Sequence, residues 1–183
     1  MHSEKIKVLQ IIGDAHLGGV VACLLNYYRH IDKSKFSFDF VTYGPSPFDE
    51  PVRQICPEAK IFYIAPIHKN PIKGMVQLAK ICKSDRYDIA HSHLTTLSAF
   101  ALASAAIARI PVRICHSHSI FDRRSDHYLI KSILRPFASV FATHLMACSR
   151  HAAENLFRKN ADKAFILMNA IEIDRFSSSE EEY

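Results

Sequence analysis

Short apolar runs alternate with longer amphipathic segments along the chain, and this alternation restricts the fold more than any other feature. Strands separated by helices pair in parallel through right-handed crossovers, and strands that are apolar throughout suit a sheet covered on both faces. We therefore expect an α/β domain, a Rossmann-like three-layer structure with a mostly parallel sheet of about seven strands. The predicted strands are 8–12, 36–43, 60–64, 88–91, 112–115, 145–148 and 164–167.

The segments between these runs have the apolar spacing of helices, and most begin with a residue that can cap a free backbone N–H. The expected caps are Asp49, Asn70, Thr95 and Ser149, and Ser125-Asp126 begins the longest helix. In the helix that follows Asn70, the residues expected to face the core are Ile72, Met75, Val76, Ala79 and Cys82. The predicted helices are 19–31, 49–55, 70–83, 95–108, 125–141 and 149–157.

The length and composition indicate one globular domain. A chain of 183 residues can bury a sizeable core, and a hydrophobic content of 49% argues against disorder. We expect residues 1–176 to form the domain, and the polar, acidic residues 177–183 to form a linker or tail. The five cysteines are scattered without a CxxC pair, which is typical of reduced thiols in a cytosol. No signal peptide is recognisable, and no apolar stretch approaches the roughly 20 residues of a membrane span, so we expect a soluble, cytoplasmic protein.

A strand, a glycine turn and a helix open the chain, and this arrangement is typical of nucleotide-binding α/β domains. Gly18 and Gly19 have no Cβ, so the backbone can approach a ligand there, and the helix that follows directs free N–H groups at the same place. Such a site suits a phosphate group. A glycine pair before a helix is also common in a simple tight turn, so this stretch alone leaves both interpretations open.

Polar residues follow the later strands at their carboxyl ends, where an open parallel sheet binds its ligands. His93 and Thr95 follow the fourth strand, His118 follows the fifth, and Ser149 follows the sixth. Among them His118 is the strongest candidate for a substrate contact, because an imidazole can donate a hydrogen bond to a sugar hydroxyl or a phosphate. Several polar strand ends at one edge favour a ligand cleft more than any one of them does.

Two His-x-His pairs, at 91–93 and 116–118, raise the question of a metal site. Residues two apart on a strand point to the same face, so both members of a pair could bind one ion. No aspartate or glutamate nearby completes a ligand set, and no cysteine is suitably spaced. We therefore expect no metal and interpret these histidines as hydrogen-bonding groups.

The predicted helix 125–141 separates cations from apolar residues. The cations on or near one side are Arg123, Arg124, Lys131 and Arg135, and the apolar residues on the other side are Leu129, Ile130, Ile133, Leu134, Phe137 and Phe141. The simpler interpretation is a core-facing helix with a solvated basic face. The functional interpretation is that the basic face rests on anionic lipid headgroups, although four cations are few for such a surface.

Two other classes of binding protein fit the sequence poorly. A dinucleotide-binding domain would carry G-x-G-x-x-G and an acid at the end of the second strand, whereas the glycines here are Gly13, Gly18 and Gly19, and Tyr43-Gly44 ends that strand. A nucleic-acid-binding domain would show a dense basic stripe or a known module, and the net charge is only +5.

A series of short motifs occurs in the order found in one enzyme family. Together they resemble the N-terminal half of family 4 glycosyltransferases of the GT-B fold, in particular the bacterial enzymes that build exopolysaccharide or capsule repeat units. The resemblance covers nearly all of the chain. The motifs are Gly18-Gly19-Val20 before Leu24-Leu25-Asn26-Tyr27-Tyr28-Arg29, Asp88-Ile89-Ala90-His91-Ser92-His93, Arg113-Ile114-Cys115-His116-Ser117-His118, Ala147-Cys148-Ser149 and Asn169-Ala170-Ile171-Glu172-Ile173-Asp174-Arg175-Phe176.

The resemblance implies a metal-independent, retaining transfer of sugar from a nucleotide-sugar donor, a UDP sugar, to a saccharide or a lipid-linked saccharide. In that family a second Rossmann-like domain holds the donor, and this chain ends where that domain would begin, so we expect the chain alone to be inactive. Gly18 and Gly19 would approach the donor diphosphate, and His118 would contact the transferred sugar or the acceptor. His93 and Thr95 would lie along the acceptor groove, and the basic helix could face a membrane.

One position departs from the family pattern. Many relatives have an acid soon after the glycine pair, where this chain has Val21 or Ala22, so an acidic role for the first helix is in doubt. Two alternatives also stay open. The domain could be a stand-alone binding or regulatory module that pairs with a separate donor-domain chain, or part of a sugar-nucleotide epimerase with the same architecture.

Overall fold

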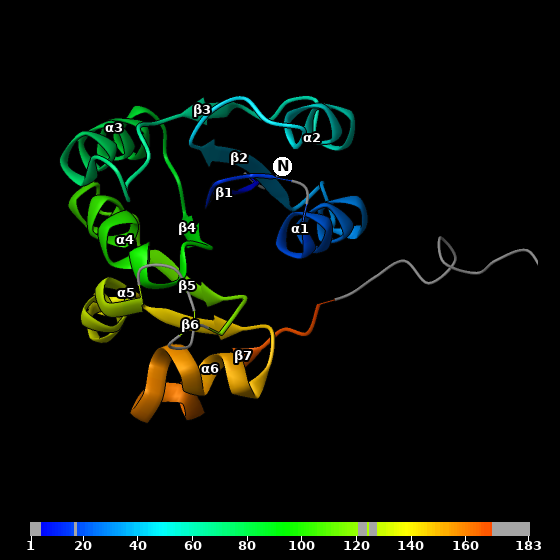
Figure 1. Ribbon diagram of the computed structural model, residues 1–183. Coiled ribbons are helices and arrows are strands. Elements are labelled where there is room, and N and C mark those ends of the chain that lie inside the picture. Colours follow the sequence, from blue (N-terminus) through cyan, green and yellow to red (C-terminus); the bar gives the residue numbers. More distant parts are fainter. Residues whose placement is uncertain (1–4, 17, 121–123, 125–127, 170–183) are drawn as a thin grey trace, which may run out of the picture.

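The structure, a computed structural model, describes residues 5–16, 18–120, 124 and 128–169. Seven parallel strands form one sheet in the order β3-β2-β1-β4-β5-β6-β7 (Figure 1). The prediction of a parallel sheet of seven strands is therefore confirmed. The strands are β1 (Ile6–Gly13), β2 (Phe36–Thr42), β3 (Ile61–Tyr63), β4 (Ile89–Ser92), β5 (Val112–Ser117), β6 (His144–Ala147) and β7 (Phe165–Ile166).

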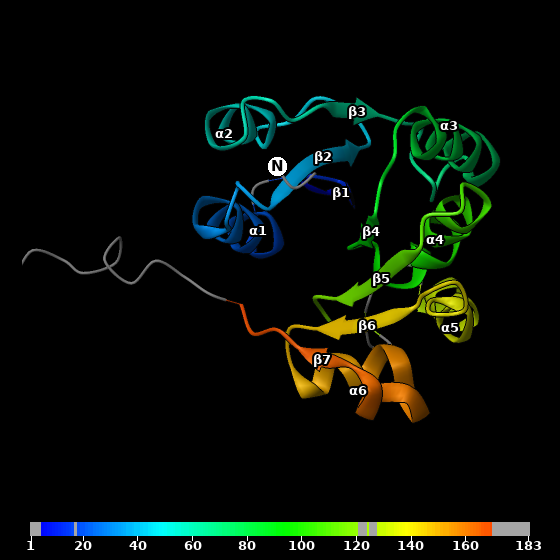
Figure 2. The same cartoon turned by 180° about the vertical axis from the view of Figure 1, so that it is seen from behind.

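Helices connect successive strands and lie on both faces of the sheet. Figures 1 and 2 show α1 and α2 together on one side, with α3, α4 and α5 along the other. The α-helices are α1 (Gly19–His30), α2 (Asp49–Ile55), α3 (Pro71–Ser84), α4 (Ser98–Ile107), α5 (Tyr128–Leu134) and α6 (Arg150–Phe157). Three short 3₁₀ helices complete the described chain: η1 (Thr95–Leu97), η2 (Arg135–Phe137) and η3 (Arg158–Lys163).

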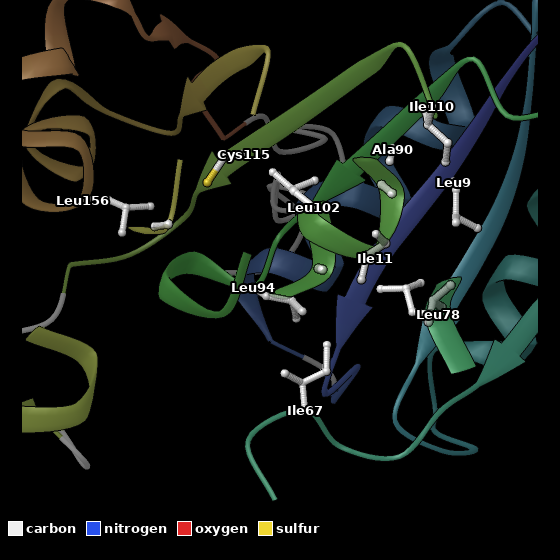
Figure 3. Packing of buried hydrophobic residues seen from close by; sticks show 14 of the residues in the cluster. Leu9, Ile11, Ile67, Leu78, Ala90, Leu94, Leu102, Ile110, Cys115 and Leu156 are labelled. Carbon is white, nitrogen blue, oxygen red and sulfur yellow. The ribbon is translucent and has the colours of Figure 1, made fainter. Parts of the chain in front are cut away.

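The central strand β1 is apolar at almost every position because both of its faces are buried. Val8 and Ile12 pack with the buried residues of α1 and α2 in one cluster. Leu9 and Ile11 belong to the opposite cluster, which also contains residues of α3, α4 and α6, and Figure 3 shows them beside Leu78 and Leu102. Strand order reverses between β1 and β4, and such a switch point is where open α/β sheets bind ligands.

The predicted helix starts are confirmed at two positions and wrong at two others. The side chains of Asn70 and Ser149 accept hydrogen bonds of 3.1 Å from the backbone N–H groups of Lys73 and Ala152, as expected of caps. Asp49 instead lies within the first turn of α2 and accepts a hydrogen bond from the hydroxyl of Tyr63.

Thr95 also does not cap α4. It lies in η1 with φ of +49°, in the left-handed region, and α4 itself begins three residues later at Ser98. A capping residue has extended backbone, so this conformation is incompatible with the predicted role. The 3₁₀ turn places Thr95 on the loop that follows β4.

Helix α3 packs through only part of the predicted face, and Cys82 is buried as expected. Ile72 is 77% exposed and Val76 is 50% exposed, so the expectation that they face the core is wrong. The buried residues, Gly74, Leu78 and Cys82, are spaced four apart. A Cβ on Gly74 would lie 2.7 Å from the carbonyl oxygen of Ala65, so glycine lets this stripe of the helix approach the chain after β3.

The segment predicted as one core-facing helix, 125–141, is shorter and only partly buried. Its expected start at Ser125-Asp126 lies outside the described residues. The α-helix ends at Leu134, before a 3₁₀ turn that contains Pro136, because proline lacks the N–H that a continued helix needs. None of the residues of α5 is buried. Across the part of the chain that the structure describes, no helix has both the length and the apolar character to cross a membrane.

Candidate functional site

The carboxyl end of β1 turns sharply at Gly13, close to the switch point. Gly13 has φ of +78°, and a Cβ there would lie 2.6 Å from the side chain of Leu94 and 3.0 Å from the ring of Tyr43. Its carbonyl oxygen accepts a hydrogen bond of 3.0 Å from the N–H of Tyr43. Only glycine fits this position, so the turn that leads to α1 is fixed by its surroundings.

The glycine pair at the start of α1 has open space beside it. Gly18 is the N-cap residue and Gly19 is the first residue of the helix, and both are exposed. Among the described residues, a Cβ on Gly19 would meet nothing within 4 Å, and one on Gly18 only the carbonyl oxygen of His16 at 3.8 Å. Packing therefore does not explain why glycine occupies these positions. The open helix end, with no acidic residue in its first turn, suits a bound anion.

Four histidines from two neighbouring strands form a cluster on one face of the sheet. The cluster consists of His91 and His93, from β4 and its carboxyl end, and His116 and His118, from β5 and its carboxyl end. Members of each pair are two residues apart and so share a face. The rings of His116 and His118 have centroids 3.9 Å apart, and those of His91 and His93 4.2 Å apart.

Hydrogen bonds connect the histidine cluster across the strands. His93 Nδ1 lies 2.7 Å from His118 Nε2, and His91 Nε2 lies 3.1 Å from His116 Nδ1. His93 Nε2 is 2.8 Å from Oε1 of Gln10, a buried residue of β1. The predicted candidates His93 and His118 are thus directly bonded to each other, and the network reaches the central strand.

Burial keeps all four histidines neutral. Loss of solvent lowers the pKa of His91 to about 3, of His116 to about 2 and of His118 to about 4, and lowers the pKa of His93 well below its usual value. A charged imidazole would be poorly solvated here, since neighbouring histidines offer it no counter-charge. At neutral pH each ring therefore has one N–H and one lone pair.

The histidine cluster also contains the one group of described residues that could hold a metal ion. Ligand nitrogens of His91, His93 and His116 lie within 4.8 Å of one another. In the structure these rings already exchange hydrogen bonds with each other and with Gln10. The absence of a metal requirement stays a prediction.

A cavity of about 320 Å³ opens beside the histidine cluster on the α1 side of the sheet. Three of the four rings line it, together with apolar and aromatic side chains from α1 and β2. Its lining includes Gln10, Leu24, Tyr28, His91, His116, His118 and Leu167. A larger hollow, of about 580 Å³, lies at the amino ends of β5 and β6 and includes none of the predicted site residues.

For Thr95 and Ser149 the structure describes no hydrogen bond to the histidine network. Thr95 is half-buried in η1, and the Ser149 hydroxyl caps α6, so a structural role already accounts for that side chain. Arg124 is exposed, Lys131 is half-buried, and Arg135 donates through Nη1 to the carbonyl oxygen of Asn155 at 3.3 Å. Arg123 lies outside the described residues.

Sequence reasoning overlooked Gln10 and gave no site role to His91 or His116. Gln10 is a single polar residue within the apolar run of β1, and it is 4% exposed. A buried amide needs hydrogen-bond partners, so a lone glutamine in a buried strand was the available signal.

The sequence of residues 17–175 matches the glycosyltransferase family 4 profile. The chain belongs to glycosyltransferase family 4. This family 4 domain is 28% identical over 187 residues to EpsF of Bacillus subtilis (strain 168), which carries the name of a glycosyltransferase. It is 20% identical over 185 residues to an Escherichia coli enzyme named UDP-Gal:alpha-D-GlcNAc-diphosphoundecaprenol alpha-1,3-galactosyltransferase. The matches cover 97% and 95% of this chain but 48% and 47% of those proteins, so the chain spans about half of their length.

Solved structures confirm the fold of the family 4 domain. Anabaena Alr3699/HepE, crystallised with UDP and glucose, superposes with a TM-score of 0.74 at 16% identity, over 96% of this chain and 47% of that one. A UDP-N-acetylglucosamine 2-epimerase superposes with a TM-score of 0.61 at 16% identity, over 91% of this chain and 49% of that one. The fold therefore matches half of a GT-B structure, but by itself it does not separate transferases from epimerases.

Proposed function

We propose that this chain is the N-terminal half of a retaining glycosyltransferase that uses a UDP sugar in bacterial surface polysaccharide synthesis. In this proposal, residues 1–176 form the acceptor-side domain, and residues 177–183 lead toward a donor-binding domain. Membership of glycosyltransferase family 4 and the similarity to EpsF support it. The half-length coverage of the relatives supports the division between two domains.

The structural observation that carries the proposal is the hydrogen-bonded pair His93 and His118 at the carboxyl ends of β4 and β5. These ends lie beside the switch point of the sheet, where α/β domains bind ligands. A neutral His118 can form a hydrogen bond with a hydroxyl of the transferred sugar or of the acceptor. His93 and Thr95 would border the acceptor groove.

The exposed N-terminus of α1 would stabilise the leaving group. As the bond to the donor sugar breaks, negative charge develops on the diphosphate, and fixed backbone N–H groups stabilise such charge without reorganising. Gly18 and Gly19 let the backbone reach the diphosphate, since no side chain in the described part of the chain fills the space beside them. No metal ion is needed for this role in the proposal.

The acceptor in this proposal is a saccharide or a lipid-linked saccharide, and the basic side of α5 would approach the inner face of the cell membrane. The E. coli relative is named for an acceptor on diphosphoundecaprenol. The described residues of α3, α4, α5 and η2 include no aspartate or glutamate, which suits an anionic surface. Large apolar side chains also point outward near α5: Leu129, Ile130, Ile133, Phe137, Val140 and Phe141.

Exposed apolar residues beside cations are typical of segments that lie in a membrane interface. Flotation with vesicles that contain anionic phospholipid tests this part of the proposal. Ile133→Ser and Lys131→Glu should weaken binding, whereas the matched controls Met168→Ser and Lys33→Glu should not. Met168 is exposed as Ile133 is, but it follows β7, away from α5. Equal binding by all variants, or none by the wild type, would show that this surface does not serve a lipid.

The catalytic part of the proposal needs the protein encoded by the complete reading frame. That protein should transfer sugar from one member of a panel of UDP sugars, whereas purified residues 1–183 should not, because the donor-binding groups would be in the other half. Turnover by residues 1–183 would contradict the division of roles. A reading frame that stops just after Tyr183 would favour the alternative of a stand-alone binding module.

One observation supports the alternative that the chain is part of an epimerase: it shares its fold with a UDP-N-acetylglucosamine 2-epimerase. Proton abstraction needs suitably placed acid and base groups. The cluster at the ends of β4 and β5 consists of neutral histidines rather than carboxylates. Incubation of the complete protein with UDP-N-acetylglucosamine alone distinguishes the two: epimerisation without an acceptor would contradict the transferase proposal.

A further inference from the structure

We propose that Gln10 and His93 are positioning residues that hold His118 in one neutral tautomer, with the proton on Nε2 and the lone pair on Nδ1. The proposal deepens the role given to His118 above and rests on the proposed function for its consequence in catalysis. The tautomer itself follows from contacts within this chain, from the central strand outward.

The first hydrogen bond has only one possible direction. Oε1 of Gln10 is a carbonyl oxygen and accepts, so the His93 Nε2 at 2.8 Å must donate. Gln10 lies between Leu9 and Ile11 in the buried centre of β1 and is itself 4% exposed. A side chain in such a position keeps its orientation, because the strand and its neighbours on both sides fix it.

The second hydrogen bond follows from the first. A neutral His93 that has its only proton on Nε2 presents a lone pair at Nδ1, so His118 Nε2, 2.7 Å away, must donate. His118 then has no proton left for Nδ1. The three residues form a relay of fixed direction, from His118 through His93 to Gln10.

The end of the relay determines what His118 can bind. Among the residues that the structure describes, His118 Nδ1 is buried and has no hydrogen-bond partner. An unprotonated ring nitrogen can accept a hydrogen bond from a hydroxyl, but it cannot donate one to a phosphate oxygen. Leaving such an atom without a partner is unfavourable, and a hydroxyl ligand would remove that cost. The relay thus selects a sugar hydroxyl over a phosphate as the partner of His118.

The backbone supports the relay independently of the side chains. β1 and β4 are adjacent, with Gln10 in register with His91, and the N–H of His93 donates to the carbonyl oxygen of Ile11 at 2.9 Å. β4 and β5 are also adjacent, with Ser92 in register with Cys115. The ladder therefore fixes the spacing of the strands that carry Gln10, His93 and His118.

Nitrogen NMR on histidine-labelled residues 1–183 at neutral pH tests the tautomer without any need for activity. We expect His118 to show a protonated Nε2 and an unprotonated Nδ1, and His93 the same arrangement. The His118→Asn variant assigns the signals. A proton on His118 Nδ1 in the folded wild-type protein would overturn the proposal, whether or not any variant folds.

A variant of Gln10 then tests what holds the tautomer. Gln10→Leu removes the acceptor and should give a mixture of both tautomers at His118. Gln54→Leu, on the exposed side of α2, is the matched control and should change nothing. An unaltered single tautomer in a folded Gln10→Leu protein would show that Gln10 does not position His118.

In the complete enzyme, Gln10→Leu should lower kcat roughly tenfold to a hundredfold with little change in KM, because misplacing a reacting group has costs of this size. If the tautomer shifts as expected but kcat does not change, the relay exists and the catalytic role proposed for His118 fails. The two readouts therefore separate failure of the relay from failure of the proposed function.

Discussion

The carboxylate of Asp39 accepts a hydrogen bond of 2.8 Å from the hydroxyl of Tyr87, and both side chains are buried. The same carboxylate accepts from the backbone N–H of Lys60 at 2.8 Å and lies 3.4 Å from the ammonium group of Lys7. It thereby ties β2 to the chain before β3 and to the loop before β4. The buried acid in the second strand is thus a structural group, not a ligand-binding one.

We expect Tyr87→Phe to lower the free energy of unfolding by about 1–2 kcal/mol, since it leaves one bond of a buried carboxylate unmade. Urea unfolding at neutral pH measures the change. Lys60→Ala is the control, because it removes only an exposed ion pair with Asp85 and keeps the backbone donor, and should cost less than about 0.5 kcal/mol. Equal effects of the two changes would contradict the role given to Asp39.

Substitution by alanine should have different effects on stability at Gly13 and at Gly19. Gly13→Ala should cost at least about 1 kcal/mol, because the backbone is in the left-handed region and the Cβ would overlap Leu94. Gly19→Ala should leave the free energy of unfolding unchanged or raise it slightly, since no described residue fills the space beside Gly19 and alanine favours a helix.

In the complete enzyme, the same Gly19→Ala change should lower kcat/KM for the UDP sugar, because the added methyl group would stand where the diphosphate approaches. Gly44→Ala, which also adds a methyl group in open space, is the functional control. If Gly19→Ala retains full activity, the glycine pair forms a turn and does not contact the donor.

Acid should destabilise this domain below about pH 6.5, the usual pKa of histidine. The histidines of the cluster have a depressed pKa in the folded state, so the unfolded chain binds protons first as the pH falls. Their contribution to stability is therefore complete above pH 6.5 and is lost progressively below it, by up to about 1.4 kcal/mol per pH unit for each histidine.

Urea unfolding in the presence of a chelator at pH 7.5, 6.5 and 5.5 checks this dependence. His116→Gln should reduce the slope between pH 6.5 and 5.5, whereas His151→Gln, a change at an exposed histidine of α6, should leave the slope as in the wild type. A stability that stays constant over this interval would mean that the cluster is not kept neutral by folding.

Zinc or cobalt should not stabilise the domain. To bind His91, His93 and His116, an ion would have to replace the hydrogen bonds that these rings make with one another and with Gln10. Thermal unfolding with one equivalent of Zn²⁺, with Co²⁺ and with EDTA should give the same Tm. A rise in Tm that His91→Ala abolishes would establish a metal site in place of a hydrogen-bonded cluster.

The strands were predicted to within two residues at every end, because burial on both faces leaves a continuous apolar run, as in β1 and β2. The packed faces of α3 and α5 were predicted less well, because these two segments contain more apolar residues than the core can cover. Ile72 and Ile133 look like core residues in sequence, yet 77% and 69% of their surfaces are exposed. The stripe of α3 that packs depends on Gly74, whose close approach to the chain after β3 appears only in three dimensions. Pro136, in contrast, was a sequence signal that the predicted helix 125–141 overlooked.

The candidate site was predicted in part. The sequence places His93 and His118 at strand ends, and the structure joins them. Their connection to Gln10 depends on the pairing of β1 with β4, which lie far apart in the sequence. Ser149 and Thr95 were predicted to bind substrate because they follow strands. A polar residue at a strand end can equally cap a helix or form a turn, and these are the roles that the structure gives them.

The central position of β1 also has a consequence for synthesis of the protein. Its first neighbour, β2, follows soon after it, but its other neighbour, β4, ends only at Ser92. At the usual 5–20 residues per second, the ribosome needs roughly 4–16 s between completing β1 and completing β4. During that interval the apolar edge of the first strand is unpaired in the nascent chain, so this is the period in which a chaperone would protect it.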